Sequence, residues 1–175
     1  NGISLKLFQK AINDLNEIDY SGVILFSAFS EPFLNKDLID LIRITKKGLP
    51  KAKLEINTNG DVIKKRPGKI IPLFENGLDS LVISIYDGPT AFKEFLNIRD
   101  SLLLTEDDVI LRRRYFDDDL GNHGLIFSNR TGLVPSNNEI TEELDSSNNL
   151  PLKKKCYYPF YQTLIDYNGD MIICP

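Results

Sequence analysis

Polar side chains gather at the ends of four short apolar runs in this chain. The residues concerned are Ser30, Glu31, Asn57, Thr58, Asn59, Ser84, Arg112 and Arg114. Their carboxylate, amide, hydroxyl and guanidinium groups are able to hydrogen-bond the amine, carboxylate and hydroxyl groups of one small ligand. In a parallel β/α barrel the ligand lies over the carboxyl ends of the strands. This distribution therefore predicts a binding site at one end of a sheet, although each group alone would also suit an ordinary solvated turn.

The two cysteines form a second candidate site. Cys156 and Cys174 both lie in the last twenty residues. In a cytosolic chain such a pair more often binds a metal or acts in catalysis than forms a structural disulfide. Between them, Asn168-Gly169 predicts a type I′ turn pairing residues 163–167 with 170–174, which would bring the two thiols together. A structural zinc site and two merely buried cysteines are both compatible with this pattern.

Strands and helices alternate over most of the chain. The apolar patterns predict strands near 23–28, 53–58, 80–86 and 109–116. Helices are expected over 3–18, with Ser4 as the candidate cap, from residue 35 or 36 to about 48, and over 90–103, with a helical stretch over 67–75. Strands separated by helices of this length indicate parallel βαβ units. Residues 135–150 are polar and predict a linker or mobile loop, with a small separate unit over 151–175.

Strand alternation predicts which side chains face the site. Asn57 and Asn59 should point inward if Leu54 and Ile56 face the helices. Ser84 is expected inward for the same reason. Arg112 and Arg114 are favoured as inward because Arg113 shares the opposite face with the apolar residues of its strand. At least one of the three arginines must instead extend to solvent.

The composition excludes several classes of protein. The chain has 175 residues, of which 42% are hydrophobic and 26% charged, as in ordinary globular proteins. A net charge of −4 and a pI near 5.1 argue against a nucleic-acid-binding surface, which needs a basic face. No apolar run approaches the roughly 20 residues of a membrane span. We therefore expect a cytoplasmic protein with no nucleic-acid or membrane partner.

Four segments resemble the radical S-adenosylmethionine (radical SAM) enzymes. Ser30-Glu31-Pro32, with its Leu-Asn-Lys-Asp continuation, resembles their Gly-Gly-Glu-Pro segment, and Asn57-Thr58-Asn59-Gly60 follows one βα unit later. Asn129-Arg130-Thr131-Gly132 resembles an Asn-Arg-Ala-Gly element. The C-terminal spacing resembles the opening of a SPASM/twitch-type C-terminal extension. Twelve residues separate Cys156 from Gly169, and four separate Gly169 from Cys174.

This resemblance implies a fold, cofactors and a reaction. The fold would be α/β: a partial parallel (β/α) barrel over residues 1–134, and a C-terminal β-hairpin that begins an auxiliary-cluster extension. The eight polar residues named first would bind S-adenosyl-L-methionine (SAM). Cys156 and Cys174 would hold an auxiliary 4Fe–4S cluster, which adds a third reading of that pair.

The catalytic 4Fe–4S cluster of these enzymes is bound by a Cys-x3-Cys-x2-Cys loop, which is absent from this chain and expected upstream. The full-length enzyme would receive electrons from ferredoxin or flavodoxin. It would generate a 5′-deoxyadenosyl radical to modify or oxidise a peptide or small molecule, whereas the fragment alone should be inactive. The alternative is a non-catalytic barrel that only binds a ligand, or a radical SAM-like pseudoenzyme.

Overall fold

The structure is a computed structural model that describes residues 2–27, 30–117, 123–125, 155 and 157–172. The chain divides into two compact units, one over Gly2–Ile126 and the other formed mainly by Phe127–Pro175. The candidate site predicted at the strand ends lies in the first unit.

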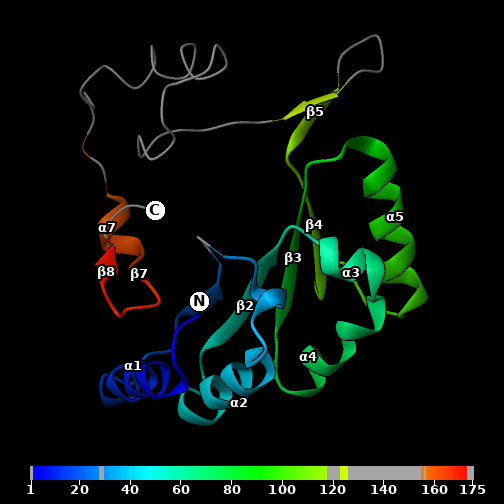
Figure 1. The fold of residues 1–175 in the computed structure, drawn as a ribbon. Helices are drawn as coiled ribbons and strands as arrows, with labels where there is room; N and C mark the ends of the chain where they lie inside the picture. Colours follow the sequence, from blue (N-terminus) through cyan, green and yellow to red (C-terminus); the bar gives the residue numbers. More distant parts are fainter. Residues whose placement is uncertain (1, 28–29, 118–122, 126–154, 156, 173–175) are drawn as a thin grey trace. The chain divides into compact units, whose positions relative to one another are not determined.

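A four-stranded parallel sheet is the centre of the first unit (Figure 1). Its strands are β1 (Val23–Phe26), β2 (Lys53–Thr58), β3 (Ser80–Ile85) and β4 (Val109–Arg113), hydrogen-bonded in that order. All three pairings are parallel, which confirms the α/β class with a parallel sheet. Because successive strands are neighbours, the segments that follow β1, β2 and β3 leave the same edge of the sheet side by side.

One helix precedes the first strand and the others connect the strands. They are α1 (Leu5–Glu17), α2 (Leu38–Gly48), α3 (Asp61–Lys65), α4 (Ile71–Glu75) and α5 (Gly88–Ser101), with short 3-10 turns at Pro32–Leu34 and Pro67–Lys69. Ser4 caps α1 as expected, because its hydroxyl accepts a hydrogen bond from the Leu7 amide.

The helical stretch expected over 67–75 is present but consists of two pieces. The structure has a 3-10 turn at Pro67–Lys69 and then α4, which carries Pro72 in its first turn. Proline has no amide hydrogen and is tolerated only at the start of a helix. Pro72 therefore lies at the beginning of a new helix, α4, which does not continue the 3-10 turn before it.

The last predicted strand of the barrel pattern, 109–116, was also too long. β4 ends at Arg113, and β5 (Tyr115–Asp117) pairs antiparallel with β6 (His123–Leu125). β3 ends at Ile85, whose carbonyl accepts the last hydrogen bond from the Arg114 amide. Beyond that point no parallel partner remains, so the chain pairs with a different strand.

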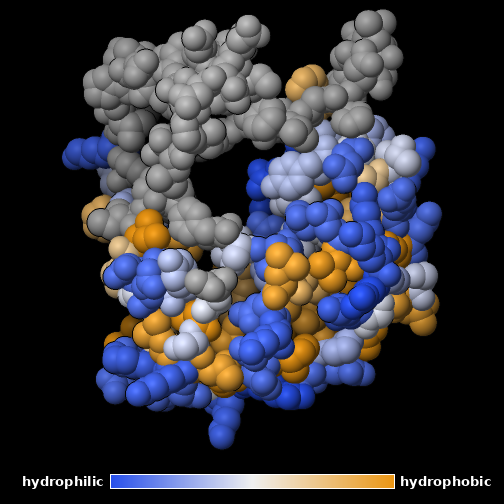
Figure 2. All heavy atoms as spheres, viewed as in Figure 1, coloured by the Kyte–Doolittle hydropathy of each residue, from blue (hydrophilic) through white to orange (hydrophobic). Residues whose placement is uncertain are grey.

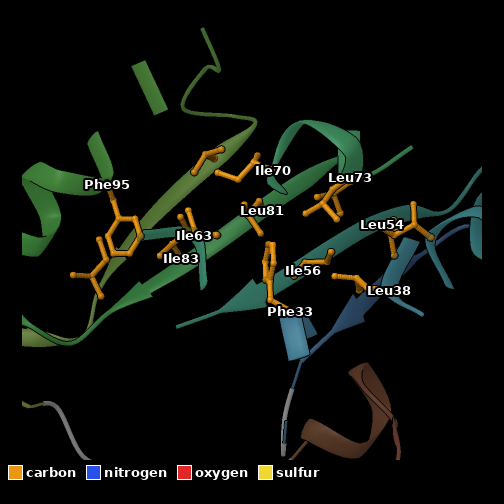
Figure 3. Packing of buried hydrophobic residues seen from close by; sticks show 14 of the residues in the cluster. Phe33, Leu38, Leu54, Ile56, Ile63, Ile70, Leu73, Leu81, Ile83 and Phe95 are labelled. Carbon is orange, nitrogen blue, oxygen red and sulfur yellow. The ribbon is translucent and has the colours of Figure 1, made fainter. Parts of the chain in front are cut away.

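The core lies between one face of the sheet and the helices (Figure 3). It contains Leu54, Ile56, Leu81 and Ile83 from the strands, and Leu38, Ile63, Leu73 and Phe95 from the helices. In β2 these residues alternate with Glu55 and Asn57, and in β3 with Val82 and Ser84. The alternation that buries the core residues therefore turns Asn57 and Ser84 to the opposite face. A second cluster joins α1 to α2 through Phe8, Ile12 and Leu41.

Asp79 connects three elements at the other end of the sheet. It precedes β3, and its carboxylate accepts hydrogen bonds from the Leu54 amide of β2 at 2.7 Å and from Lys46 Nζ of α2 at 2.8 Å. Partial burial raises the pKa of Asp79, but these hydrogen bonds and the neighbouring lysine charges outweigh that effect. The net pKa lies below its ordinary value.

We expect Asp79→Asn to lower the free energy of unfolding by about 1 kcal/mol at neutral pH, because it removes the charge from both hydrogen bonds. The lowered folded-state pKa means that this stabilisation is present above the ordinary carboxyl pKa, about 4, and is lost as the pH falls through the folded-state pKa. The stability difference between wild type and variant, measured by urea unfolding, should therefore shrink toward about pH 3. A difference independent of pH would contradict this assignment.

The second unit contains α7 (Tyr158–Tyr161) and an antiparallel pair, β7 (Leu164–Ile165) and β8 (Met171–Ile172). Ile165 pairs with Met171, and the Asp166 amide donates to the Asp170 carbonyl. Five residues, 166–170, separate the strands. The hydrogen bond between Asp166 and Asp170 closes a three-residue loop over 167–169, with Gly169 at φ 93°.

The two-residue turn predicted at Asn168-Gly169 was wrong. It would pair Ile165 with Ile172, whereas Ile165 pairs with Met171 in the structure. A three-residue loop with a left-handed glycine is the next most common hairpin connection. The Asp166 carboxylate selects it here by accepting the amide hydrogens of Asn168 and Asp170.

Hydrophilic side chains cover much of the face seen in Figure 2, with hydrophobic patches between them. Among the residues that the structure describes, no helix is long and apolar enough to cross a membrane.

Candidate functional site

A polar pocket lies at the carboxyl ends of β1, β2 and β3. Its volume is about 270 Å³. It is lined by Ser27, Ser30, Glu31, Asn57, Thr58, Asn59, Ser84 and Tyr86. The structure thus brings together six of the eight residues expected to bind a cofactor, from three different strand ends. Their role in binding stays a prediction.

Glu31 lies at the centre of the hydrogen bonds around this pocket. Its Oε1 accepts from Thr58 Oγ1 at 2.6 Å and from the Phe33 amide at 3.2 Å, and its Oε2 accepts from the Asn59 amide at 3.0 Å. The sequence interpretation was that this carboxylate binds a ligand amine. In the structure its main contacts are to the protein itself.

Asn57 and Ser84 form the floor of the pocket on β2 and β3. Ser84 Oγ donates to Asn57 Oδ1 at 3.1 Å. This contact occupies the side-chain amide oxygen of Asn57. The Nδ2 group of Asn57 makes no hydrogen bond to any other described residue. Asn57 therefore presents a hydrogen-bond donor whose orientation is set by Ser84.

Asn59 uses both ends of its amide to begin α3. Its Oδ1 accepts from the Asp61 amide at 3.0 Å, and its Nδ2 donates to Asp61 Oδ2 at 3.1 Å. The intervening Gly60 has φ 81° and is buried. Asn59 lies beyond the end of β2, so the strand alternation used to predict its direction does not extend to it.

Arg112 and Arg114 are not among the residues that line the pocket. Arg112 pairs with Ser84 in the register of β3 and β4, so it belongs to the same face of the sheet, one strand further away. Arg114 follows β4 and donates its amide to Ile85. Arg113 pairs with Ile85 on the opposite face, and its guanidinium lies 4.9 Å from the centre of the Tyr115 ring.

Two pocket residues, Ser27 and Tyr86, were missed as site residues. Each directly follows a strand, β1 or β3. For Tyr86 the available signal was its position two residues after Ser84, which places both on one face. Ser27 lay inside the apolar run taken as a strand, and its closeness to the pocket follows from the end of β1 at Phe26.

The proposed metal ligands Cys156 and Cys174 lie outside the described residues, as do Asn129, Arg130 and Thr131. The assignment of the two cysteines as ligands therefore stays a prediction. Within the described ranges, no group of three His, Cys, Asp or Glu side chains is placed to hold a metal ion.

One curated protein with a similar sequence is the "S-adenosyl-L-methionine-dependent 2-deoxy-scyllo-inosamine dehydrogenase" of Niallia circulans. It is 26% identical over 167 residues, which cover 91% of this chain and 63% of that protein. No family model matches the chain.

Two solved structures have a similar fold. One is the crystal structure of BtrN in complex with AdoMet and 2-DOIA, with a TM-score of 0.70 and 22% identity, covering 99% of this chain and 61% of BtrN. The other is selenomethionine BtrN in an open conformation, with a TM-score of 0.62 and 16% identity, covering 98% and 57%. The fold is thus similar to that of BtrN. The chain spans about three fifths of the length of these relatives.

These comparisons correct the assignment to radical SAM enzymes with a SPASM/twitch-type extension. The relatives are BtrN-like, and nothing in them supports such an extension over residues 151–175. The assignment of the extension rested on two cysteines, one glycine and a turn. So short a pattern specifies a hairpin between two thiols and does not identify the domain around it.

Proposed function

We propose that the full-length protein is a SAM-dependent dehydrogenase of the radical SAM type, and that the pocket at the ends of β1, β2 and β3 binds SAM. The observation that carries this proposal is the convergence in one pocket of Glu31, the Asn57–Asn59 segment and Ser84. The sequence resemblance assigns these same residues to SAM. The similar dehydrogenase, which is SAM-dependent by name, supports the cofactor and the class of reaction.

The pocket has the groups that SAM requires. The Ser27, Ser30 and Tyr86 side chains make no hydrogen bond to other described residues, and with Asn57 Nδ2 they are able to bind the carboxylate, amino and ribose groups of SAM. Arg112 lies one strand away on the same face and is our candidate partner for the carboxylate. A 4Fe–4S cluster, reduced by ferredoxin or flavodoxin, would supply the electron that cleaves SAM, while this chain binds and orients it.

The substrate we propose is a small polyhydroxylated amine, one of whose alcohols is oxidised to a ketone. The similar dehydrogenase acts on 2-deoxy-scyllo-inosamine by name. The pocket side chains named above are assigned to SAM, so the choice of substrate rests on this similarity alone.

The decisive experiment uses full-length protein prepared without oxygen. With SAM, a reductant and 2-deoxy-scyllo-inosamine, we expect 5′-deoxyadenosine and an oxidised aminocyclitol in stoichiometric amounts. Binding of SAM without 5′-deoxyadenosine, in protein that contains its iron, would indicate the non-catalytic binding protein. Absence of SAM binding in such protein would refute the proposed site.

Asn57→Ala tests the pocket directly. We expect SAM affinity, measured by titration calorimetry, to fall about tenfold, because the variant removes the donor on the pocket floor and leaves the Ser84 hydroxyl unpaired. Asn13→Ala is the matched control, since Asn13 is an exposed residue of α1 whose hydrogen bond is to Gln9. Equal affinities of the two variants would exclude Asn57 from the site.

A further inference from the structure

The carboxylate of Glu31 connects the segments that follow β1 and β2. Three donors converge on it: the Thr58 hydroxyl, the Phe33 amide and the Asn59 amide. Phe33 belongs to the turn after β1, whereas Thr58 and Asn59 are 27 and 28 residues away from Glu31 along the chain. All three partners donate, which suits an ionised carboxylate, since that group only accepts.

Thr58 extends this connection to Gly60. The Thr58 hydroxyl donates to Glu31 and accepts from the Gly60 amide at 3.0 Å. Thr58 is only 3% exposed, and it pairs with Ile83 of the hydrophobic core. Each function of its hydroxyl is therefore used within the protein, and the turn over residues 58–60 is held at two amides and one side chain.

We propose that Glu31 is a positioning residue, which holds the 58–60 turn in the shape that the SAM pocket needs, and that it acts through Thr58 and Asn59. This inference rests on the proposed function. Two carboxylate oxygens offer about four acceptor positions, and three are occupied by the protein. The turn follows directly on Asn57, so its shape sets the direction of the Nδ2 donor on the pocket floor.

The hydrogen bonds to Glu31 are expected to be strong because its carboxylate is charged, and charge-assisted hydrogen bonds are roughly twice as strong as neutral ones. Glutamine in the same place has one oxygen that accepts and one nitrogen that only donates. In Glu31→Gln an NH2 group therefore replaces the oxygen that accepts from the Thr58 hydroxyl or from the Asn59 amide, so that one acceptor is lost. The size of the side chain changes little.

The test compares Glu31→Gln, Thr58→Val, Thr58→Ser and the double variant Glu31→Gln/Thr58→Val in the full-length protein. The readouts are hydrogen–deuterium exchange at the Asn59 and Gly60 amides and SAM affinity by calorimetry. We expect Glu31→Gln and Thr58→Val each to speed exchange at least tenfold and to weaken SAM binding. Thr58→Ser keeps the hydroxyl and should restore slow exchange. The double variant should lose less than the sum of the two single variants, because both remove the Glu31–Thr58 hydrogen bond.

A direct ligand role for Glu31 predicts a different pattern. Glu31→Gln would then weaken SAM binding without faster exchange at Asn59 and Gly60, and the loss would add to that of Thr58→Val. That result would overturn the positioning role. If wild-type protein does not bind SAM at all, the proposed function fails, and the exchange rates still decide whether Glu31 holds the turn.

Discussion

Gly60→Ala is expected to lower the free energy of unfolding by about 3 kcal/mol, from left-handed backbone strain together with overpacking. Gly60 has φ 81°, where residues with a side chain are strained. A Cβ atom there would lie 2.4 Å from Cζ of Phe95 and 2.9 Å from Cγ2 of Ile83. Neither neighbour has room to move, because both are 1% exposed in the core. Chemical denaturation of both proteins measures the effect.

The same variant should also weaken SAM binding. Shifting residue 60 displaces its amide from the Thr58 hydroxyl and with it the turn next to Asn57. Gly68→Ala is the matched control, since a Cβ at Gly68 meets nothing within 4 Å, and its stability should change by less than about 0.5 kcal/mol. Equal losses in the two variants would show that the contact with Phe95 is not the cause.

Phe95→Ala is expected to be the most destabilising single substitution considered, by about 3–5 kcal/mol. Phe95 lies on α5, and Figure 3 shows its ring beside Ile63 and Ile83. Its ring also lies 5.3 Å from the Lys64 ammonium group, a cation–π contact worth about 0.5–1 kcal/mol at a partly exposed site. Truncation leaves a cavity where the sheet, α3 and α5 meet.

Thermal and urea unfolding would measure this loss, with Phe92→Ala as the control on the same helix. Phe92 is only partly buried against the core, so its truncation should cost clearly less than that of Phe95. A larger loss at Phe92 would contradict the packing described. Because Phe95 packs behind Gly60, we also expect Phe95→Ala to loosen the 58–60 turn, with faster amide exchange at Gly60.

The order of elements in the first unit could be predicted from the amino-acid sequence. Apolar runs of strand length alternate with helical patterns, and that periodicity is local information, so the parallel sheet and the Ser4 cap of α1 were both found. Strand alternation likewise placed Asn57 and Ser84 on one face, because successive side chains of a strand point to opposite sides wherever the strand continues.

Alternation failed where strands end. It was applied to Asn59 beyond β2 and to Arg114 beyond β4, and neither position belongs to a strand in the structure. Only the end of β3 at Ile85 decides where β4 stops, since a strand needs a partner. The register of β7 and β8 was misjudged for a related reason. The Asp166 carboxylate selects a three-residue loop, although Asn-Gly favours a two-residue turn.

The role of Glu31 depends on tertiary structure alone. Its sequence neighbourhood is compatible with a solvated turn or with a ligand for an amine. What distinguishes these is the approach of Thr58 and Asn59 to within 3.0 Å of its oxygens. These residues are 27 and 28 positions away along the chain. The parallel pairing of β1 with β2 brings them there, and a hydrogen bond depends on that distance in space and not on separation in sequence.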